Sequence, residues 1–127
     1  MDTRRVDSPI ERKLLDSFDR LGLKPLYQHR IGIFRVDFAF PGIKLAVECD
    51  GHWYHTSESQ RARDRYRQSK IREQGWVFER FQGWLIYRHS LACASKIALK
   101  YFPDKIGEKA KKLAIGSMVT MYARTNP

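Results

Sequence analysis

Apolar side chains with helical spacing mark the beginning of the chain. They recur every three or four positions after the segment Ser8–Glu11, which has the Ser-Pro start and the later Glu of a capping box. Gly22 is expected to end this helix. The same pattern predicts a helix from Ser90 to the break at Pro103. A polar, arginine-rich helix that ends at Gly75 is expected at residues 58–74, and a lysine-rich helix at residues 104–115.

Residues 26–40 are expected to be extended, with plain alternation of apolar and polar positions over 33–40, and further strands are predicted at residues 44–50 and 76–81. In the first strand, the side chains expected on one face are Phe34, Val36, Phe38 and Phe40, and those on the other are Ile33, Arg35, Asp37 and Ala39. Pro41-Gly42 is expected to form the turn to the second strand. The order α-β-β-α-β-α, with a last lysine-rich helix, predicts an α/β fold with a mixed central sheet flanked by helices.

A single domain is expected from 127 residues, with its core at about 8–102 and a basic C-terminal helix and tail at 103–127. The formal net charge of +10 favours a polyanionic partner, and nucleic acid is the one that we expect. A membrane surface is not expected, because no strongly amphipathic basic helix stands out. A homodimer or a protein partner that targets the chain is left open.

A cytoplasmic location is expected, because no apolar run approaches the roughly 20 residues of a membrane span and the first residues lack a signal-peptide stretch. Cys49 and Cys93 form no Cys-x-x-Cys pair, which argues against structural zinc. In a reducing compartment both are expected to be free thiols. No small-molecule cofactor is indicated.

Three acidic residues in the two predicted strands carry the clearest chemical signal. Asp37 lies in an apolar strand, and Glu48 and Asp50 lie on one face of the next. Buried carboxylates are costly unless they are paired or bound to metal. Because oxygen ligands favour hard cations, the trio predicts a Mg²⁺ or Mn²⁺ site. The alternatives are an ion pair between Asp37 or Glu48 and an arginine, and a turn at Asp50-Gly51.

Two histidines follow these acids. His52 and His55 could serve as a general base or hold a phosphate group. Alternatively, they lie in a surface loop that packs with Trp53 and Tyr54. Zinc is disfavoured there, because no further soft ligand is nearby.

Basic residues crowd two predicted helices. Arg63, Arg67 and Lys70 in the first, and Lys111 and Lys112 in the last, form either solvated faces or contacts to phosphates. Asp64 and Arg67 share a helix face, which is also typical of a surface ion pair.

Several segments together resemble the Vsr-like branch of the PD-(D/E)xK nucleases, which includes the very-short-patch-repair endonucleases and phage homing endonucleases with an EDxHD signature. The resemblance covers about residues 8–90 and rests on the order and spacing of six segments: 8–14, 28–32, 35–38, 45–55, 63–67 and 75–81. It implies a restriction-endonuclease-like fold with a mixed sheet.

The resemblance also implies roles for individual residues. Asp37 matches the main metal ligand, Glu48 the acid of the (D/E)xK element, and the backbone carbonyl of Cys49 a further ligand. The other positions that match are His55, expected to help activate water, Asp64 on the following helix, and Glu11, expected both to cap its helix and to contact the site.

The chain departs from the family pattern at informative positions. Val36 stands where the motif has proline, and Asp50 where many of these enzymes carry lysine. His55, Arg67 or Lys70 could supply the missing positive charge. The zinc ligands of the Vsr enzymes are not reproduced, so mismatch specificity does not follow.

These observations predict a metal-dependent DNA endonuclease in which Asp37, Glu48 and Asp50 hold Mg²⁺ and the basic helices contact the DNA backbone. Trp53 or Tyr54, beside His52, could insert into a base stack. The alternatives are a non-catalytic nucleic-acid-binding module on the same fold, and a nuclease that acts on RNA or in defence.

Overall fold

The computed structural model describes residues 8–51 and 57–125 of the chain. Its elements, in order, are α1 (Pro9–Arg20), β1 (Leu26–Ile31), β2 (Phe34–Phe40), the short 3₁₀ helix η1 (Pro41–Ile43), β3 (Leu45–Asp50), α2 (Glu58–Glu73), β4 (Val77–Gln82), α3 (Gly83–Tyr101) and α4 (Glu108–Thr125). They fall into two compact units. The sheet unit is Leu26–Gln82, and the helical unit joins Met1–Pro25 to Gly83–Pro127. The expectation of a single domain stays a prediction.

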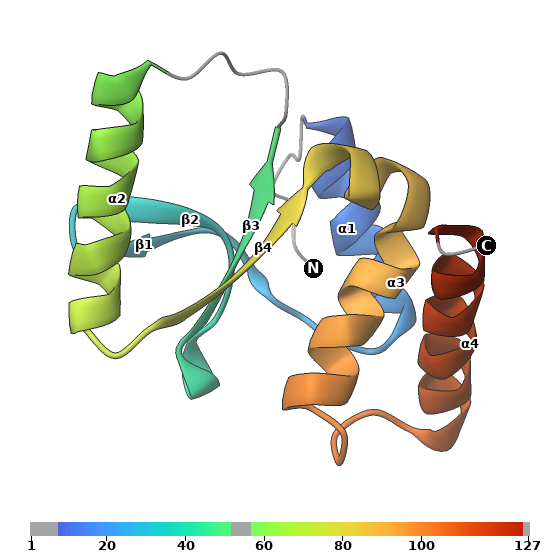
Figure 1. Cartoon of the computed structure of the whole chain (residues 1–127). Helices are drawn as coiled ribbons and strands as arrows, with labels where there is room; N and C mark the ends of the chain where they lie inside the picture. The colour runs from blue at the N-terminus through green and yellow to red at the C-terminus, as the bar shows by residue number, and fades with distance from the viewer. Residues whose placement is uncertain (1–7, 52–56, 126–127) are drawn as a thin grey trace. The chain divides into compact units, whose positions relative to one another are not determined.

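The sheet unit contains a four-stranded mixed sheet in the order β1-β2-β3-β4, as the α/β pattern predicted (Figure 1). The first two pairings are antiparallel and β3 pairs with β4 in parallel. A parallel pair needs a crossover connection, and α2 lies in the one between β3 and β4. The parallel register places Glu48 beside Arg80 and Asp50 beside Gln82.

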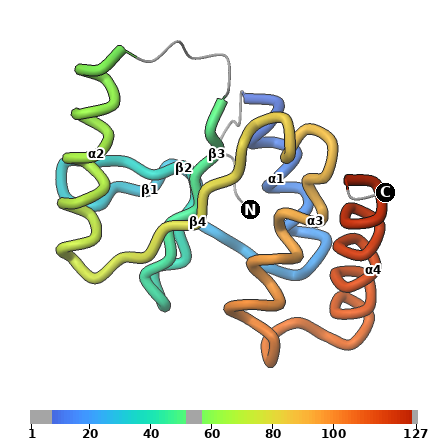
Figure 2. Tube along the Cα trace, in the orientation of Figure 1, coloured from blue at the N-terminus to red at the C-terminus, as the bar shows by residue number. Residues whose placement is uncertain are grey.

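Helix α2 packs on this sheet through one buried aliphatic side chain. Ile71 is fully buried in a cluster with Ile31, Val36, Ala39 and Ala46. The helix lies across the β1–β2 hairpin in both ribbon and tube views (Figure 2). The rest of α2 is highly polar, so this anchor near its C-terminal end leaves its N-terminal turns available for charged contacts.

The predicted single strand over residues 26–40 is wrong in one respect, because the segment folds into a hairpin. Gly32, with φ of 63°, allows the turn between β1 and β2. Strict alternation also fails, because Val36 and Ala39 share one core cluster. Between the register pairs on either side of Asp37, Gln28 adopts φ of 52°, so β1 is locally irregular there while the register of the hairpin is unchanged.

The helical unit contains α1, α3 and α4. Helix α1 begins as predicted, because the Ser8 hydroxyl accepts a hydrogen bond from the Glu11 main-chain N–H at 3.3 Å. Helix α3 starts at Gly83, earlier than expected, and its helical geometry is broken at His89. The predicted start at Ser90 therefore corresponds to the second segment of α3. The apolar run before it offered no polar face from which a helix could be recognised.

Helix α4 lies four residues later at its start, and ten later at its end, than the predicted range 104–115. Its C-terminal half contains Gly116 and Ser117, which are weak helix formers, so sequence pattern alone stopped short. Packing against α3 supplies the missing stabilisation, and the Ser95 and Ser117 hydroxyls are hydrogen-bonded at 2.9 Å. Among the described helices, none has the length and apolar character that crossing a bilayer requires.

Candidate active site

Asp37 and Glu48 meet where β2 runs beside β3. The Cys49 main-chain N–H donates to Asp37 Oδ2 at 2.8 Å, and the Asp37 main-chain N–H donates to Glu48 Oε2 at 3.4 Å. Gln28 Nε2 contacts Asp37 Oδ1 at 3.4 Å. Each strand thus holds a carboxylate of its neighbour, and Asp37 and Glu48 lie together as their neighbouring strands predicted. The role of the Cys49 carbonyl as a metal ligand stays a prediction.

Glu48 is buried and its charge is balanced by an arginine from α2. Only 6% of Glu48 is exposed, and Arg67 Nη2 lies 2.5 Å from Glu48 Oε1. The same guanidinium donates to the Arg35 main-chain carbonyl at 2.7 Å and to Asp64 Oδ1 at 3.2 Å. The ion pair between Asp64 and Arg67 that their spacing indicated therefore exists, and it extends inward to the sheet.

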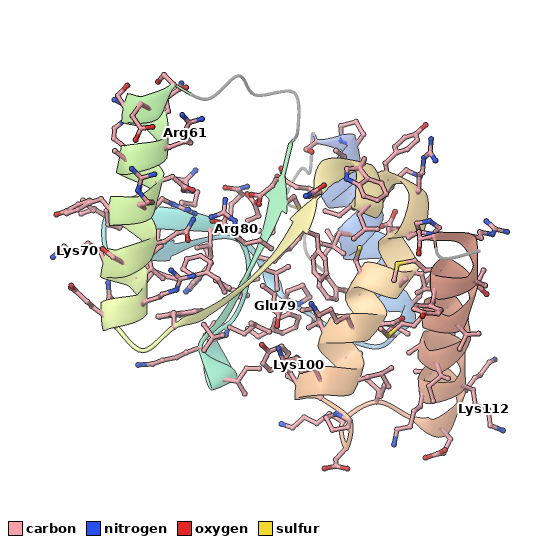
Figure 3. All side chains as sticks on the ribbon, viewed as in Figure 1. Arg61, Lys70, Glu79, Arg80, Lys100 and Lys112 are labelled. Atoms are coloured by element: carbon pink, nitrogen blue, oxygen red, sulfur yellow. The ribbon has the colours of Figure 1, made fainter. Side chains whose placement is uncertain are left out.

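A second arginine connects Asp64 to Asp50. Arg80, from β4, holds Asp50 through two bonds, Nη2 to Oδ1 at 2.7 Å and Nε to Oδ2 at 2.9 Å. Its Nη1 reaches Asp64 Oδ2 at 3.2 Å. The bond to Asp50 raises the pKa of Arg80, against the opposing effect of burial. Figure 3 shows Arg80 between β4 and α2.

Negative charge remains in excess across this network. Among the described residues that form it, the two guanidinium groups of Arg67 and Arg80 face four carboxylates. A pocket of about 500 Å³ opens at one end, lined in part by Asp50, Asp64 and Arg80. A cation is therefore favoured near these acids.

The donor chemistry of Asp37 and Glu48 fits Mg²⁺. Mg²⁺ is held in proteins by one or two carboxylates and keeps several water ligands. Within residues 8–51 and 57–125, no three His, Cys, Asp or Glu side chains are grouped as metal ligands. A site of two carboxylates, a main-chain carbonyl and water does not need a third such side chain. Asp50, the third predicted acid, is instead engaged by Arg80.

The roles of four further predicted site residues stay predictions. His52, Trp53 and His55 lie outside the described residues. Glu11 belongs to α1 in the helical unit, where its main-chain N–H is capped by Ser8.

The predicted nucleic-acid-binding residues lie on the surfaces of α2 and α4. Arg63 is exposed, and Lys70 projects from the outer side of α2, where it contacts Glu73 at 3.4 Å (Figure 3). Lys111 lies 3.9 Å from Glu108, whereas Lys112 is exposed and lines a second pocket. Their roles toward nucleic acid stay predictions.

Arg80 was not recognised as a site residue from the sequence. It alternates with buried Glu79 and Phe81 in a predicted strand, so a polar environment on its face could be expected. Its partners Asp50 and Asp64 depend on the parallel pairing of β3 with β4, which no local pattern reveals. Gln68, which donates to Asp64 at 2.9 Å, was missed for a similar reason.

The comparisons with known proteins agree on the kind of fold. The restriction-endonuclease-like family REase_MTES_1575 has a model that matches residues 10–100. The catalytic domain of the homing endonuclease I-Bth0305I is similar in structure, with a TM-score of 0.55, 15% identity, and coverage of 88% of this chain and 99% of that domain. At this identity the likeness supports the fold alone.

Two curated relatives from Mycobacterium tuberculosis are similar over part of the chain. They are "Uncharacterized protein MT2308" of strain CDC 1551 / Oshkosh and "Uncharacterized protein Rv2248" of strain ATCC 25618 / H37Rv. Each is 36% identical over 53 residues, which is 42% of this chain. The matched part spans only 20% of the length of either relative.

Proposed function

Because the chain belongs to the restriction-endonuclease-like family REase_MTES_1575, we propose that it is a metal-dependent endonuclease that hydrolyses phosphodiester bonds in DNA. The observation that carries the proposal is the meeting of Asp37, Glu48 and the Cys49 backbone on adjacent strands. The residue matches to the Vsr-like branch, and the similarity in structure to a homing endonuclease catalytic domain, favour DNA over other phosphodiesters.

Asp37, Glu48 and the Cys49 main-chain carbonyl would hold Mg²⁺ or Mn²⁺. When bound, the cation would lower the pKa of a water molecule and neutralise charge on the scissile phosphate. The Cys49 N–H fixes the Asp37 carboxylate, and Arg67 of α2 fixes the Glu48 carboxylate. Arg67 and Arg80 keep the four acids close together without cancelling their charge.

The second candidate function is nucleic-acid binding without catalysis. The observation in its favour is that Glu48 and Asp50 are already paired with arginines, as structural carboxylates would be. The charge excess counts against it, because acids that face a phosphate backbone weaken binding.

Cleavage of supercoiled plasmid separates the two candidates. Wild type is incubated with Mg²⁺, with Mn²⁺ or with EDTA, alongside Asp37→Asn, Glu48→Gln and the matched control Glu58→Gln. Glu58 lies on the exposed surface of α2, where it pairs with Arg61 and Arg65 of the same helix. A labelled RNA in a parallel reaction tests the choice of DNA.

Cleavage is expected with either cation and not with EDTA. Loss of a metal ligand is expected to slow it by about 100-fold or more in Asp37→Asn and Glu48→Gln, and the control should cut at the wild-type rate. Titration of Mg²⁺ by calorimetry should show weaker binding to the same two variants. Binding of DNA without cleavage under every metal condition would instead support the non-catalytic candidate.

A further inference from the structure

We propose that a groove between α3 and α4, in the helical unit, binds the phosphodiester backbone of DNA. The groove is a pocket of about 550 Å³. It is distinct from the acidic network, which belongs to the sheet unit. The inference rests on the proposed function, because it assigns a second contact to the same DNA substrate.

The charge of the groove favours an anion. Arg88, Lys112 and Arg124 line it, together with the imidazole of His89, and no acidic side chain is among its lining residues. The three cationic residues are exposed. The pocket of the acidic network, in contrast, has two aspartates in its lining.

The polar groups between the cations suit phosphate oxygens. Ser90 and Thr120 contribute hydroxyls to the lining, whereas the Ser117 hydroxyl already donates to the Ala114 carbonyl within α4. The break in α3 at His89, with φ of −140° and ψ of 46°, also starts a new helical segment whose first residues line the groove. The first N–H groups of a helical segment are favourable to anions. These N–H groups would strengthen the attraction to phosphate, which is due mainly to the cationic side chains.

The shape of the groove favours a polymer over a free phosphate. Lys112, Gly116, Thr120 and Arg124 recur every four residues and so form one face of α4. From Lys112 to Arg124 this face extends about 18 Å at the helical rise of about 1.5 Å per residue. One phosphate cannot contact both ends. A strand of DNA, which advances about 3.4 Å per phosphate along the duplex axis, can contact them with successive groups.

The floor of the groove leaves room for a backbone to approach. A Cβ atom built on Gly116 meets nothing within 4 Å, so the middle of the α4 face is open. Bulk or negative charge placed there should block the approach of a phosphate without disturbing packing. Gly116 therefore gives a test that is independent of the cationic side chains.

The test measures binding of a labelled duplex by fluorescence anisotropy, in EDTA, over a series of salt concentrations. The groove variant is Lys112→Gln/Arg124→Gln. Its matched control is Lys100→Gln/Lys105→Gln, which removes two exposed charges from the same unit outside the groove. The second variant is Gly116→Glu, matched by Val119→Glu at an exposed position of α4 that does not line the groove.

The groove double variant is expected to bind about 10- to 60-fold more weakly at about 0.1 M salt, and its salt slope should fall by about 1.8, the counterion release of two phosphates. Gly116→Glu should weaken binding while its thermal stability is unchanged or higher, because glutamate is the better helix former. The two controls should stay within about 3-fold of wild type, which is the effect expected of diffuse charge alone.

Equal losses in the groove variants and their controls would overturn the proposal, as would a wild type that binds no DNA. A calorimetric titration with pyrophosphate provides another contrary outcome. If Lys112→Gln/Arg124→Gln removes the heat of pyrophosphate binding but leaves the affinity for the duplex unchanged, the groove binds a free phosphate compound and not DNA. Plasmid cleavage by the same variants keeps the two proposals apart. Groove-dependent binding without cleavage refutes the endonuclease alone, and cleavage with groove-independent binding refutes the groove alone.

Discussion

Replacing Arg67 by methionine tests whether the acidic network depends on its inner arginine. The change keeps an unbranched side chain that reaches about as far as the arginine Nε, and it removes the guanidinium group that faces Glu48. The Glu48 side chain is 7% exposed and that of Arg67 is 20% exposed. Loss of one partner from a buried ion pair costs about 3–5 kcal/mol. Because Arg67 is partly solvated and Glu48 keeps its contact from the Asp37 N–H, we expect about 3 kcal/mol.

Urea unfolding followed by circular dichroism, in EDTA, measures this loss. With a urea dependence of about 2 kcal/mol per molar, the midpoint should fall by about 1.5 M. Arg61→Met is the control, because Arg61 lies on the same helix in an exposed pair with Glu58. Its midpoint should correspond to a change below about 0.5 kcal/mol.

Repeating the unfolding with Mg²⁺ connects the network to the proposed cation. If a cation and the Arg67 guanidinium compete for Glu48, Mg²⁺ should bind the variant more tightly and so stabilise it more than wild type. The reasoning is refuted if Arg67→Met unfolds at the wild-type midpoint in EDTA. Equal Mg²⁺ stabilisation of both proteins would refute the competition while leaving the ion pair intact.

Two further predictions concern the thiol of Cys93 and the turn at Gly75. Burial raises the pKa of the Cys93 thiol to about 12, so iodoacetamide at pH 8 should label this thiol only after unfolding. Because the thiol of the unfolded chain has a pKa of about 8.5, the free energy of unfolding should decline as pH rises from about 8.5 toward 12. Rapid labelling of the native protein, read by mass spectrometry, would contradict this. Gly75→Ala should cost about 1–2 kcal/mol in thermal unfolding, because Gly75 has φ of 90°. Gly42→Ala, at an open position without positive φ, should cost almost nothing, and equal losses would disprove the explanation.

The fold was accessible from sequence wherever one local pattern decided the structure. The capped start at Ser8, the end of α1 before Gly22 and the arginine-rich α2 all follow from spacing and capping residues. The β1–β2 hairpin was missed because Gly32 is a single turn glycine between two extended segments, and one long strand explains such a sequence equally well. The end of α4 was missed because packing on α3, and not helix propensity, stabilises its second half.

Only those contacts of the site that join consecutive strands of the chain could be predicted from the sequence. Asp37 and Glu48 lie on the two strands joined by η1, so their convergence could be predicted. Arg80 reaches Asp50 across a parallel pairing that forms after the α2 crossover, 30 residues further along the chain. Long-range pairing of this kind leaves no periodic signal, and charged residues in a short strand have many potential partners.

The position two residues after Glu48 shows how the network accommodates its departure from the motif. The motif lysine is replaced by Asp50, which removes a positive charge and adds a negative one beside the acids. Of the two described residues considered as substitutes, Lys70 pairs with Glu73 on the outer surface, whereas Arg67 contacts Glu48 directly. Arg80 then neutralises Asp50 itself. Positive charge thus reaches the acids from α2 and β4, and the anchor of α2 at Ile71 holds Arg67, one turn earlier, against the sheet.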